Sequence, residues 1–363
     1  MSAERPPEMI APGSSDTARV DIDWKDATGH FHGQAGDRVL YAGLAAGVPL
    51  PHECATGTCG SCKATLVQGR VDPAWPQAPG AQALRAAHGE ILLCQSRLAG
   101  DCRVRIGKSR PPAASITRPR FTEGRVVRSG RLTHDVVLLQ MALDAPMPFL
   151  PGQFLLIAAP GVPGFRAYSM VNAPDGGDRV ELIVKRKPEG ALSAVLFSRS
   201  LHRLTFQVFG PLGRACLQLH APGDALCIAG GTGIAGLMSV LEAASRDGWL
   251  REHRASVYFG VRHVQDLFFL DRLSALRERH PDHLDITIAI SDEPAPATVA
   301  FKHDGLRFFQ GMVHEAPQSH PPILGEQPLA YIAGPPAAVA AATRVALLNY
   351  RIPSGRILFD RFG

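Results

Sequence analysis

Short segments that alternate between hydrophobic and polar residues open the chain. Residues 18–24 and 28–34 predict the first hairpin of a small mixed sheet, and residues 102–106 predict a strand that closes it. Between them, Leu40, Leu44 and Val48 recur every four residues and predict a helix, with Asp37 as its expected cap. The pattern therefore predicts a small α+β domain.

A second group of short β-rich segments follows, separated by Pro, Gly and Asp residues. These segments cover residues 121–128, 135–143, 153–158, 179–187 and 205–209. Many short strands at regular spacing, with turn residues between them, are typical of an antiparallel barrel.

Apolar strand candidates alternate with helical segments in the last third of the chain. The expected strands cover residues 225–229, 255–259, 284–290, 329–333 and 356–359. The helical periodicity is carried by Ile234, Leu237, Met238 and Leu241, and later by Leu267, Leu270, Leu273 and Leu276. Alternating strands and helices predict an α/β domain with a doubly wound parallel sheet.

These patterns divide the 363 residues into domains. Residues 1–17 are rich in Pro, Ser and charge and are expected to be disordered. The α+β domain is expected at 18–108, a polar linker with prolines at 109–117, the barrel at 118–221 and the α/β domain at 222–363.

Composition narrows the class of protein. A hydrophobic fraction of 45% and a charged fraction of 20% are ordinary for a globular protein. The chain has no apolar run of about 18 residues and no signal-peptide core, so we expect a cytoplasmic protein without a membrane partner. The net charge of +5 is concentrated in residues 118–222, which suits either a phosphate-bearing cofactor or a solvated surface. The chain lacks a broad basic face, so we do not expect it to bind nucleic acid.

Four cysteines carry the strongest chemical signal. Cys54, Cys59 and Cys62 have C-x4-C-x2-C spacing, and Cys94 follows after 31 residues. This is the plant-type spacing of [2Fe–2S] ligands, and glycines between them allow the loop to curl around a compact cluster. Zinc more often uses paired C-x2-C knuckles, and disulfides need an oxidising compartment. The remaining cysteines are expected to pack as small buried residues: Cys102, Cys216 and Cys227.

Two further stretches could bind cofactors. Arg166, Tyr168 and Ser169 could pair with a phosphate, stack on a flat ring and hydrogen-bond its edge, although a half-exposed strand can carry the same residues. Gly190 and Ser193 lie at a helix start, where free N–H groups attract anions.

A glycine turn begins the α/β domain. Gly230, Gly231, Thr232 and Gly233 lie between an expected strand and an expected helix. A phosphate could rest against this turn and the helix N-terminus, although the sequence departs from G-x-G-x-x-G. A tight turn without a ligand is the alternative.

These motifs together carry a family resemblance. The stretches Leu50-Pro51-His52-Glu53-Cys54 and Gly69-Arg70-Val71-Asp72 resemble plant-type ferredoxins, which have a β-grasp-like fold. The order Arg-x-Tyr-Ser, Gly-x-x-Ser, Gly-Gly-Thr-Gly over residues 118–363 resembles the ferredoxin–NADP reductase superfamily. The combination is similar to reductase components of multicomponent bacterial oxygenases and to reductases of deoxysugar biosynthesis.

The resemblance implies a role for each motif. The cysteines Cys54, Cys59, Cys62 and Cys94 would hold the cluster. The FAD contacts would be Arg166, Tyr168 and Ser169, with Gly190 and Ser193 at its pyrophosphate. The pyridine nucleotide would meet Gly230, Gly231, Thr232, Gly233, Arg262, Gly334 and Pro335.

The chain departs from the family pattern at two positions. Ala333 replaces the cysteine that usually lies near the reacting nicotinamide carbon, which puts the efficiency of hydride transfer in doubt. Ala235 replaces a proline, and we expect little effect. The C-terminal Phe362 either approaches the flavin or packs as a terminal aromatic residue.

The resemblance implies that NADH reduces FAD, that FAD reduces the cluster, and that the cluster reduces a protein acceptor, a Rieske dioxygenase or a diiron monooxygenase. Arg262 would favour NADPH, whereas the likeness to oxygenase reductases favours NADH. A deoxysugar-type reductase, a flavin and iron–sulfur sensor and a zinc-stapled module are the alternatives.

Overall fold

The computed structural model describes residues 17–110, 117–216 and 223–362. Its contacts divide the chain into two compact units. The first contains the residues up to Phe121 and the segment Leu156–Ala167, and the second contains Thr122–Leu155 and the residues from Tyr168 onward. Residues 1–16 of the expected disordered N-terminus and most of the expected linker lie outside the described residues, whereas residue 17 already belongs to a strand.

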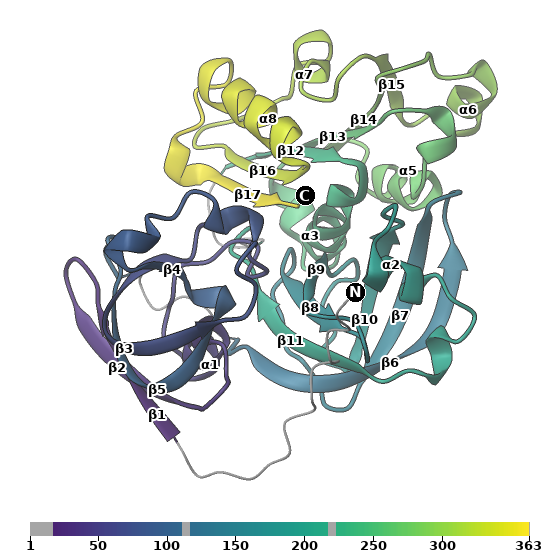
Figure 1. The fold of residues 1–363 in the computed structure, drawn as a ribbon. Coiled ribbons are helices and arrows are strands. Elements are labelled where there is room, and N and C mark those ends of the chain that lie inside the picture. Colours follow the sequence, from purple (N-terminus) through teal and green to yellow (C-terminus); the bar gives the residue numbers. More distant parts are fainter. Residues whose placement is uncertain (1–16, 111–116, 217–222, 363) are drawn as a thin grey trace. The chain divides into compact units, whose positions relative to one another are not determined.

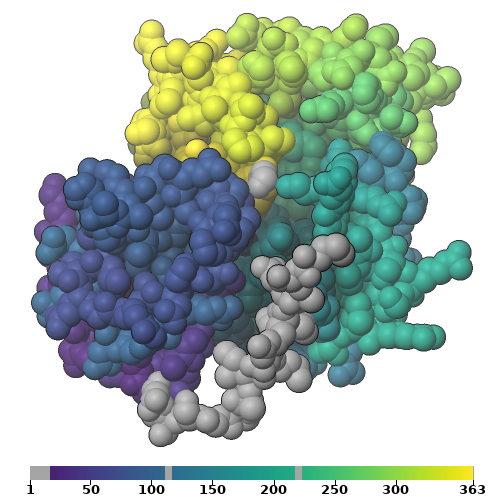
Figure 2. Space-filling view, in the orientation of Figure 1, coloured from purple at the N-terminus to yellow at the C-terminus, as the bar shows by residue number. Residues whose placement is uncertain are grey.

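A five-stranded mixed sheet forms the ferredoxin domain (Figure 1). Its strands are β1 (Thr17–Asp23), β2 (Thr28–Gln34), β3 (Lys63–Pro73), β4 (Glu90–Leu92) and β5 (Ser96–Arg105), in the order β2-β1-β5-β3-β4. Strand β1 pairs antiparallel with β2 and parallel with β5. The helix α1 (Val39–Ala45) buries Leu40 and Leu44. The purple and blue residues of this domain form one closely packed body in the space-filling view (Figure 2).

Two local predictions in this domain were wrong. The helix N-cap is Arg38 and not Asp37, because the Asp37 carboxylate accepts the Gln34 N–H at 2.9 Å and so closes the preceding turn. Val48 lies beyond the helix, which ends before Gly47, a residue with a φ of 81°.

The flavin domain is a nearly closed antiparallel sheet, as predicted. Its order is β10-β7-β6-β11-β8-β9. The strands are β6 (Arg120–Arg131), β7 (Val136–Leu143), β8 (Phe154–Ala158), β9 (Arg166–Ser169), β10 (Arg179–Lys185) and β11 (Phe206–Leu212). A bridge between Met170 and Leu182 links the end of β9 to β10 and completes the barrel. The boundary between the two units passes through β8 and β9.

The nucleotide-binding domain is the predicted doubly wound parallel sheet, in the order β15-β14-β13-β12-β16-β17. Its strands are β12 (Ala225–Gly230), β13 (Ala255–Val261), β14 (Leu284–Ile290), β15 (Arg307–Gln310), β16 (Leu329–Gly334) and β17 (Ile357–Arg361). The longer helices are α3 (Ile234–Arg246), α5 (Leu270–Arg279) and α8 (Pro336–Leu348). Because the strand order reverses between β12 and β16, the switch point that binds ligands in such sheets lies there.

Strand β12 shows how the sheet separates two cores. Its residues Leu226 and Ile228 pack with Val339 of α8, whereas Cys227 and Ala229 pack in the core that contains α3 and α5. Successive side chains of a strand point to opposite faces, so a continuous apolar run is needed when helices cover both faces. This explains why the β12 sequence does not alternate with polar residues.

Most of the flavin barrel belongs to the same unit as the nucleotide-binding domain, and the two share polar contacts within that unit. The Ser239 hydroxyl of α3 donates to the Asn172 carbonyl at 2.8 Å. Arg272 of α5 contacts Glu181 of β10 at 3.3 Å and also pairs with Glu242. These contacts hold the two domains in a defined arrangement.

The three cysteines outside the expected cluster site are buried, as predicted. Burial raises the pKa of Cys102 to about 11 and those of Cys216 and Cys227 to about 12. No helix in the described part of the chain is long and apolar enough to span a membrane.

Candidate functional site

The four predicted cluster cysteines come together around one loop. Cys54, Cys59 and Cys62 lie between α1 and β3, and Cys94 lies in the short 3-10 helix Leu93–Gln95 that follows β4. The sulfurs of Cys62 and Cys94 are 3.3 Å apart. Backbone N–H groups of Thr56 and Cys59 donate to the Cys54 sulfur at 3.4 Å.

Backbone conformation shapes this loop. Ala55, Gly57 and Gly60 have φ angles of 55°, 97° and 75°, and such angles turn amide groups towards a common centre. A Cβ at Gly80 would lie 2.7 Å from the Gly60 nitrogen, and the Gly80 N–H donates to the Gly57 carbonyl at 2.9 Å. Gly80 therefore packs directly on the cluster loop, which sequence reasoning missed because it belongs to no spacing motif.

The surroundings of the four thiols suit a metal cluster with thiolate ligands. The pKa of Cys54 is lowered, mainly because it accepts a hydrogen bond from the Cys59 thiol, and that of Cys62 is lowered by its hydrogen bond with Cys94. The pKa values of Cys59 and Cys94 are raised by the same hydrogen bonds and by burial. The N–H groups directed at sulfur and the four adjacent thiols are the donor set that an iron–sulfur cluster requires.

Exposure separates the four cysteines. Cys54, Cys62 and Cys94 are buried, whereas Cys59 is exposed. The Cys59 side of the loop is therefore the side that an external protein can reach.

The predicted flavin residues occupy strand β9. Arg166 is exposed, and its Nη1 donates to the Phe165 carbonyl at 3.0 Å. Tyr168 is half-buried and Ser169 is buried. A Cβ at Gly236 would lie 3.7 Å from the Ser169 Cβ, so the strand passes close to the first turn of α3.

The Gly190–Ser193 pair forms the first turn of α2 (Ala191–Leu196). The Ser193 hydroxyl accepts the Lys187 N–H at 3.1 Å and donates to the Gly190 carbonyl at 2.9 Å, so it holds the turn. Beside it lies a cavity of about 640 Å³. Its lining residues are Asp135, Lys185, Arg186, Lys187, Pro188, Glu189, Gly190, Ala191 and Ala194. Three of these carry positive charge and two carry negative charge, and Lys185 pairs with Asp135 at 3.1 Å, so the net positive charge available to a phosphate comes from Arg186 and Lys187.

The glycine turn lies at the switch point of the parallel sheet. Strand β12 ends at Gly230, a short 3-10 helix covers Gly231–Gly233, and α3 begins at Ile234. A Cβ at Gly233 would lie 2.5 Å from the Ala333 carbonyl oxygen, and one at Gly334 would lie 3.2 Å from the Gly230 nitrogen. The two loops therefore meet backbone to backbone, which only glycine allows.

This contact brings together the residues predicted at the nucleotide: Gly230, Gly231, Thr232, Gly233, Gly334 and Pro335. The nearby Ala333 is buried. Phe362 donates its N–H to the Gly334 carbonyl at 3.1 Å, and its ring meets that of Phe154 edge to face, with centres 6.1 Å apart. Phe362 thus packs beside this loop, on the ring of Phe154.

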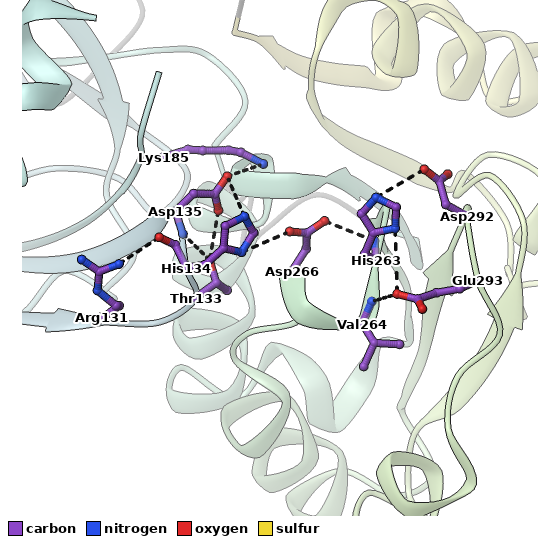
Figure 3. Close-up of polar contacts among 10 residues, drawn as sticks. All are labelled: Arg131, Thr133, His134, Asp135, Lys185, His263, Val264, Asp266, Asp292 and Glu293. Carbon is purple, nitrogen blue, oxygen red and sulfur yellow. Dashed lines mark hydrogen bonds and ion pairs between the residues drawn. The ribbon is translucent and has the colours of Figure 1, made fainter. Parts of the chain in front are cut away.

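Carboxylates surround the carboxyl end of β13, where Arg262 was predicted to meet the nucleotide (Figure 3). His263 Nε2 lies 3.7 Å from Asp292 and Nδ1 lies 3.9 Å from Glu293. Glu293 also accepts the Val264 N–H at 2.7 Å, and Asp266 accepts the His263 N–H at 3.2 Å. Sequence reasoning missed Asp292 and Glu293, although they lie only two and three residues after the expected end of strand β14 at residue 290.

Three family models match the chain. A 2Fe-2S iron-sulfur cluster binding domain matches residues 22–99, an Oxidoreductase FAD-binding domain matches 123–216, and an Oxidoreductase NAD-binding domain matches 227–344. Together they cover the regions in which the candidate sites lie.

Known proteins are similar to the chain over most of its length. The ferredoxin–NAD(+) reductase component of an alkene monooxygenase system from Xanthobacter autotrophicus is 35% identical over 334 residues, which are 92% of this chain and 97% of that protein. Ferredoxin–NAD(P)(+) reductase CarAd from Metapseudomonas resinovorans is 31% identical over 335 residues, 90% and 95% of the two chains. The solved ferredoxin reductase in carbazole 1,9a-dioxygenase superposes with a TM-score of 0.77 at 28% identity, covering 96% of this chain and 100% of that one.

Proposed function

Because the chain belongs to the family of ferredoxin–NAD(P)+ reductase components of oxygenase systems, we propose that it oxidises NADH and passes the electrons to a terminal oxygenase. It is an oxidoreductase with domains for a [2Fe–2S] cluster, FAD and NAD. The observation that carries the proposal is the gathering of four cysteine thiols in the same chain as a flavin barrel and a glycine turn at a switch point.

The proposal gives each site residue the role that the family resemblance implies. The cluster ligands are Cys54, Cys59, Cys62 and Cys94. The flavin contacts are Arg166, Tyr168, Ser169, Gly190 and Ser193, and the nucleotide contacts are Gly230, Gly231, Thr232, Gly233, Arg262, Gly334 and Pro335. FAD, when bound, accepts a hydride and releases electrons singly, as a one-electron cluster needs. The protein's own contribution is to hold these groups and to exclude competing reactions.

The nucleotide preference rests on the carboxylates near β13. In doubly wound sheets the ribose lies beyond the strand next to the glycine-turn strand, and its 2′ position meets a carboxylate in NAD enzymes and an arginine in NADP enzymes. Strand β13 is next to β12, and its end carries Arg262 but also faces Asp266, Asp292 and Glu293 (Figure 3). These negative charges would repel a 2′-phosphate, so the site favours NADH.

The acceptor and the location extend the same proposal. The similar proteins serve monooxygenase and dioxygenase systems, so a terminal oxygenase is favoured over a deoxysugar enzyme or a sensing role. The acceptor would approach the exposed Cys59 side of the cluster loop. A cytoplasmic location suits the cysteine thiols, which stay reduced there. The proposal keeps the expected domain bounds of 18–108, 118–221 and 222–363.

Initial rates with an artificial one-electron acceptor, measured against both nucleotides, test the preference. We expect a lower KM for NADH at similar turnover. A lower KM for NADPH with equal turnover would overturn the NADH assignment, and no turnover with either nucleotide in protein that contains FAD and iron would overturn the proposed function.

A further inference from the structure

Arg38 connects the start of α1 to the last cluster cysteine. Its Nη1 donates to the Cys94 carbonyl at 2.7 Å and to the Gln95 Oε1 at 2.8 Å. Its guanidinium carbon lies 5.6 Å from the centre of the Tyr41 ring, a residue that is 2% exposed and whose hydroxyl donates to the Ala55 carbonyl in the cluster loop. The guanidinium is thus fixed from three directions.

The network continues from Arg38 to a sulfur. Gln95 is 6% exposed, and its Nε2 donates to the Cys94 sulfur at 3.7 Å. A guanidinium has only donors, so it must bind the amide oxygen, and this leaves the amide NH2 for the sulfur. Gly57 leaves room for this side chain, because a Cβ there would lie 2.8 Å from the Gln95 Nε2.

The charge of Arg38 has no carboxylate to balance it among the described residues, because its hydrogen bonds go to neutral oxygens. A second arginine, Arg97, faces it in a backbone bridge, and the pKa of Arg97 is lowered by burial and by the Arg38 charge. A half-buried cation without a counter-charge is costly. The negative charge closest to Arg38 would be that of the cluster held by Cys94, because Arg38 binds the Cys94 carbonyl and reaches the Cys94 sulfur through Gln95.

We propose that Arg38, acting through Gln95, raises the reduction potential of the cluster and so favours its reduction. The inference rests on the proposed function, since it requires the cysteines to hold a [2Fe–2S] group. One electron adds one negative charge to the cluster, and no bond is made or broken. A nearby positive charge and an N–H···S hydrogen bond both stabilise the reduced form, and these are the means by which proteins set such potentials. Arg38 is therefore a positioning residue that acts on the cluster.

A redox titration of the purified holoprotein, with dithionite as reductant and electron paramagnetic resonance of the reduced cluster as readout, tests the inference. Arg38→Gln removes the charge, and we expect the reduced-to-oxidised ratio at a given potential to fall roughly tenfold, which for one electron is about 59 mV. Arg38→Lys keeps the charge and should recover part of this shift. The matched control is Arg103→Gln, which removes an exposed arginine of β5 in the same domain and should leave the potential unchanged.

A second variant tests the route through Gln95. Gln95→Met removes the donor to the sulfur and should also lower the potential, and the double variant with Arg38→Gln should shift it by less than the sum of the single shifts. If Arg38→Gln fails to assemble a cluster, Gln95→Met and Arg38→Lys decide the question. Unchanged potentials in variants with normal iron and sulfide content would overturn the inference. Wild-type protein that binds no iron–sulfur cluster would instead overturn the proposed function.

Discussion

Gly233 and Gly230 belong to the same nucleotide turn but have opposite steric surroundings. A Cβ at Gly233 would lie 2.5, 2.6 and 2.7 Å from the carbonyl oxygen and carbon of Ala333 and the nitrogen of Gly334. All three are backbone atoms, which cannot move aside by changing rotamer. A Cβ at Gly230 would meet nothing closer than the Pro335 Cδ at 3.4 Å, which is an ordinary contact.

The two alanine variants should therefore differ in stability. Gly233→Ala forces the β12 and β16 loops apart, and overpacking of this kind costs about 2–3 kcal/mol. For a domain of this size the loss corresponds to a decrease of about 4–12 °C in Tm. Gly230→Ala should change the stability by no more than about 0.5 kcal/mol, because its φ of −109° suits alanine and its surroundings are open.

Differential scanning calorimetry of both variants beside the wild type measures this difference, and NADH binding reports on the loop. We expect a lower Tm and weaker NADH binding for Gly233→Ala, because the turn and the Gly334 loop no longer meet. Equal Tm values for the two variants would refute the argument from backbone contact. They would show that the turn relaxes freely.

Three more predictions concern specificity, hydride transfer and the buried thiols. The double change Asp292→Asn and Glu293→Gln should raise kcat/KM for NADPH relative to NADH by roughly tenfold, since the repulsion between each half-exposed carboxylate and the 2′-phosphate contributes up to about 1 kcal/mol. An unchanged ratio would show that these carboxylates do not determine the nucleotide preference. Ala333→Cys should speed flavin reduction in stopped-flow experiments, whereas the matched Ala333→Ser should not; equal rates would show that the thiol is dispensable. Burial raises the pKa of three cysteines, so they should not react with a thiol reagent in the folded protein at pH 8; fast reaction at pH 8 would contradict their burial. The free energy of unfolding should also decrease as the pH rises above about 8.5 towards 11–12, because only the thiols of the unfolded chain ionise in that range. These cysteines are Cys102, Cys216 and Cys227.

Local sequence patterns predicted the three architectures because each depends on short-range periodicity. The glycine turn was visible because a strand, glycines and a helix follow one another within residues 225–246. The cysteine spacing identified the cluster loop for the same reason. Strands β4 and β15 were missed because they have only 3 and 4 residues. Strand β3 was missed although it has 11 residues, because its residues do not alternate regularly between buried and exposed.

Residues that support the sites from a distance could not be predicted. Arg38 reaches Cys94 across 56 positions of sequence, and Glu293 reaches Val264 across 29. Both contacts arise from tertiary structure, the second because neighbouring parallel strands end at the same edge of a sheet. Asp37 was assigned as a cap because its type suits that position, but the turn after β2 competes for its carboxylate.

An anaerobic visible spectrum of the purified protein, before and after addition of NADH, tests the proposed electron path most directly. We expect flavin absorption with a broad iron–sulfur shoulder, and both should bleach within the mixing time. A colourless protein that carries zinc on Cys54, Cys59, Cys62 and Cys94 would contradict it, as would a coloured protein that neither NADH nor NADPH reduces.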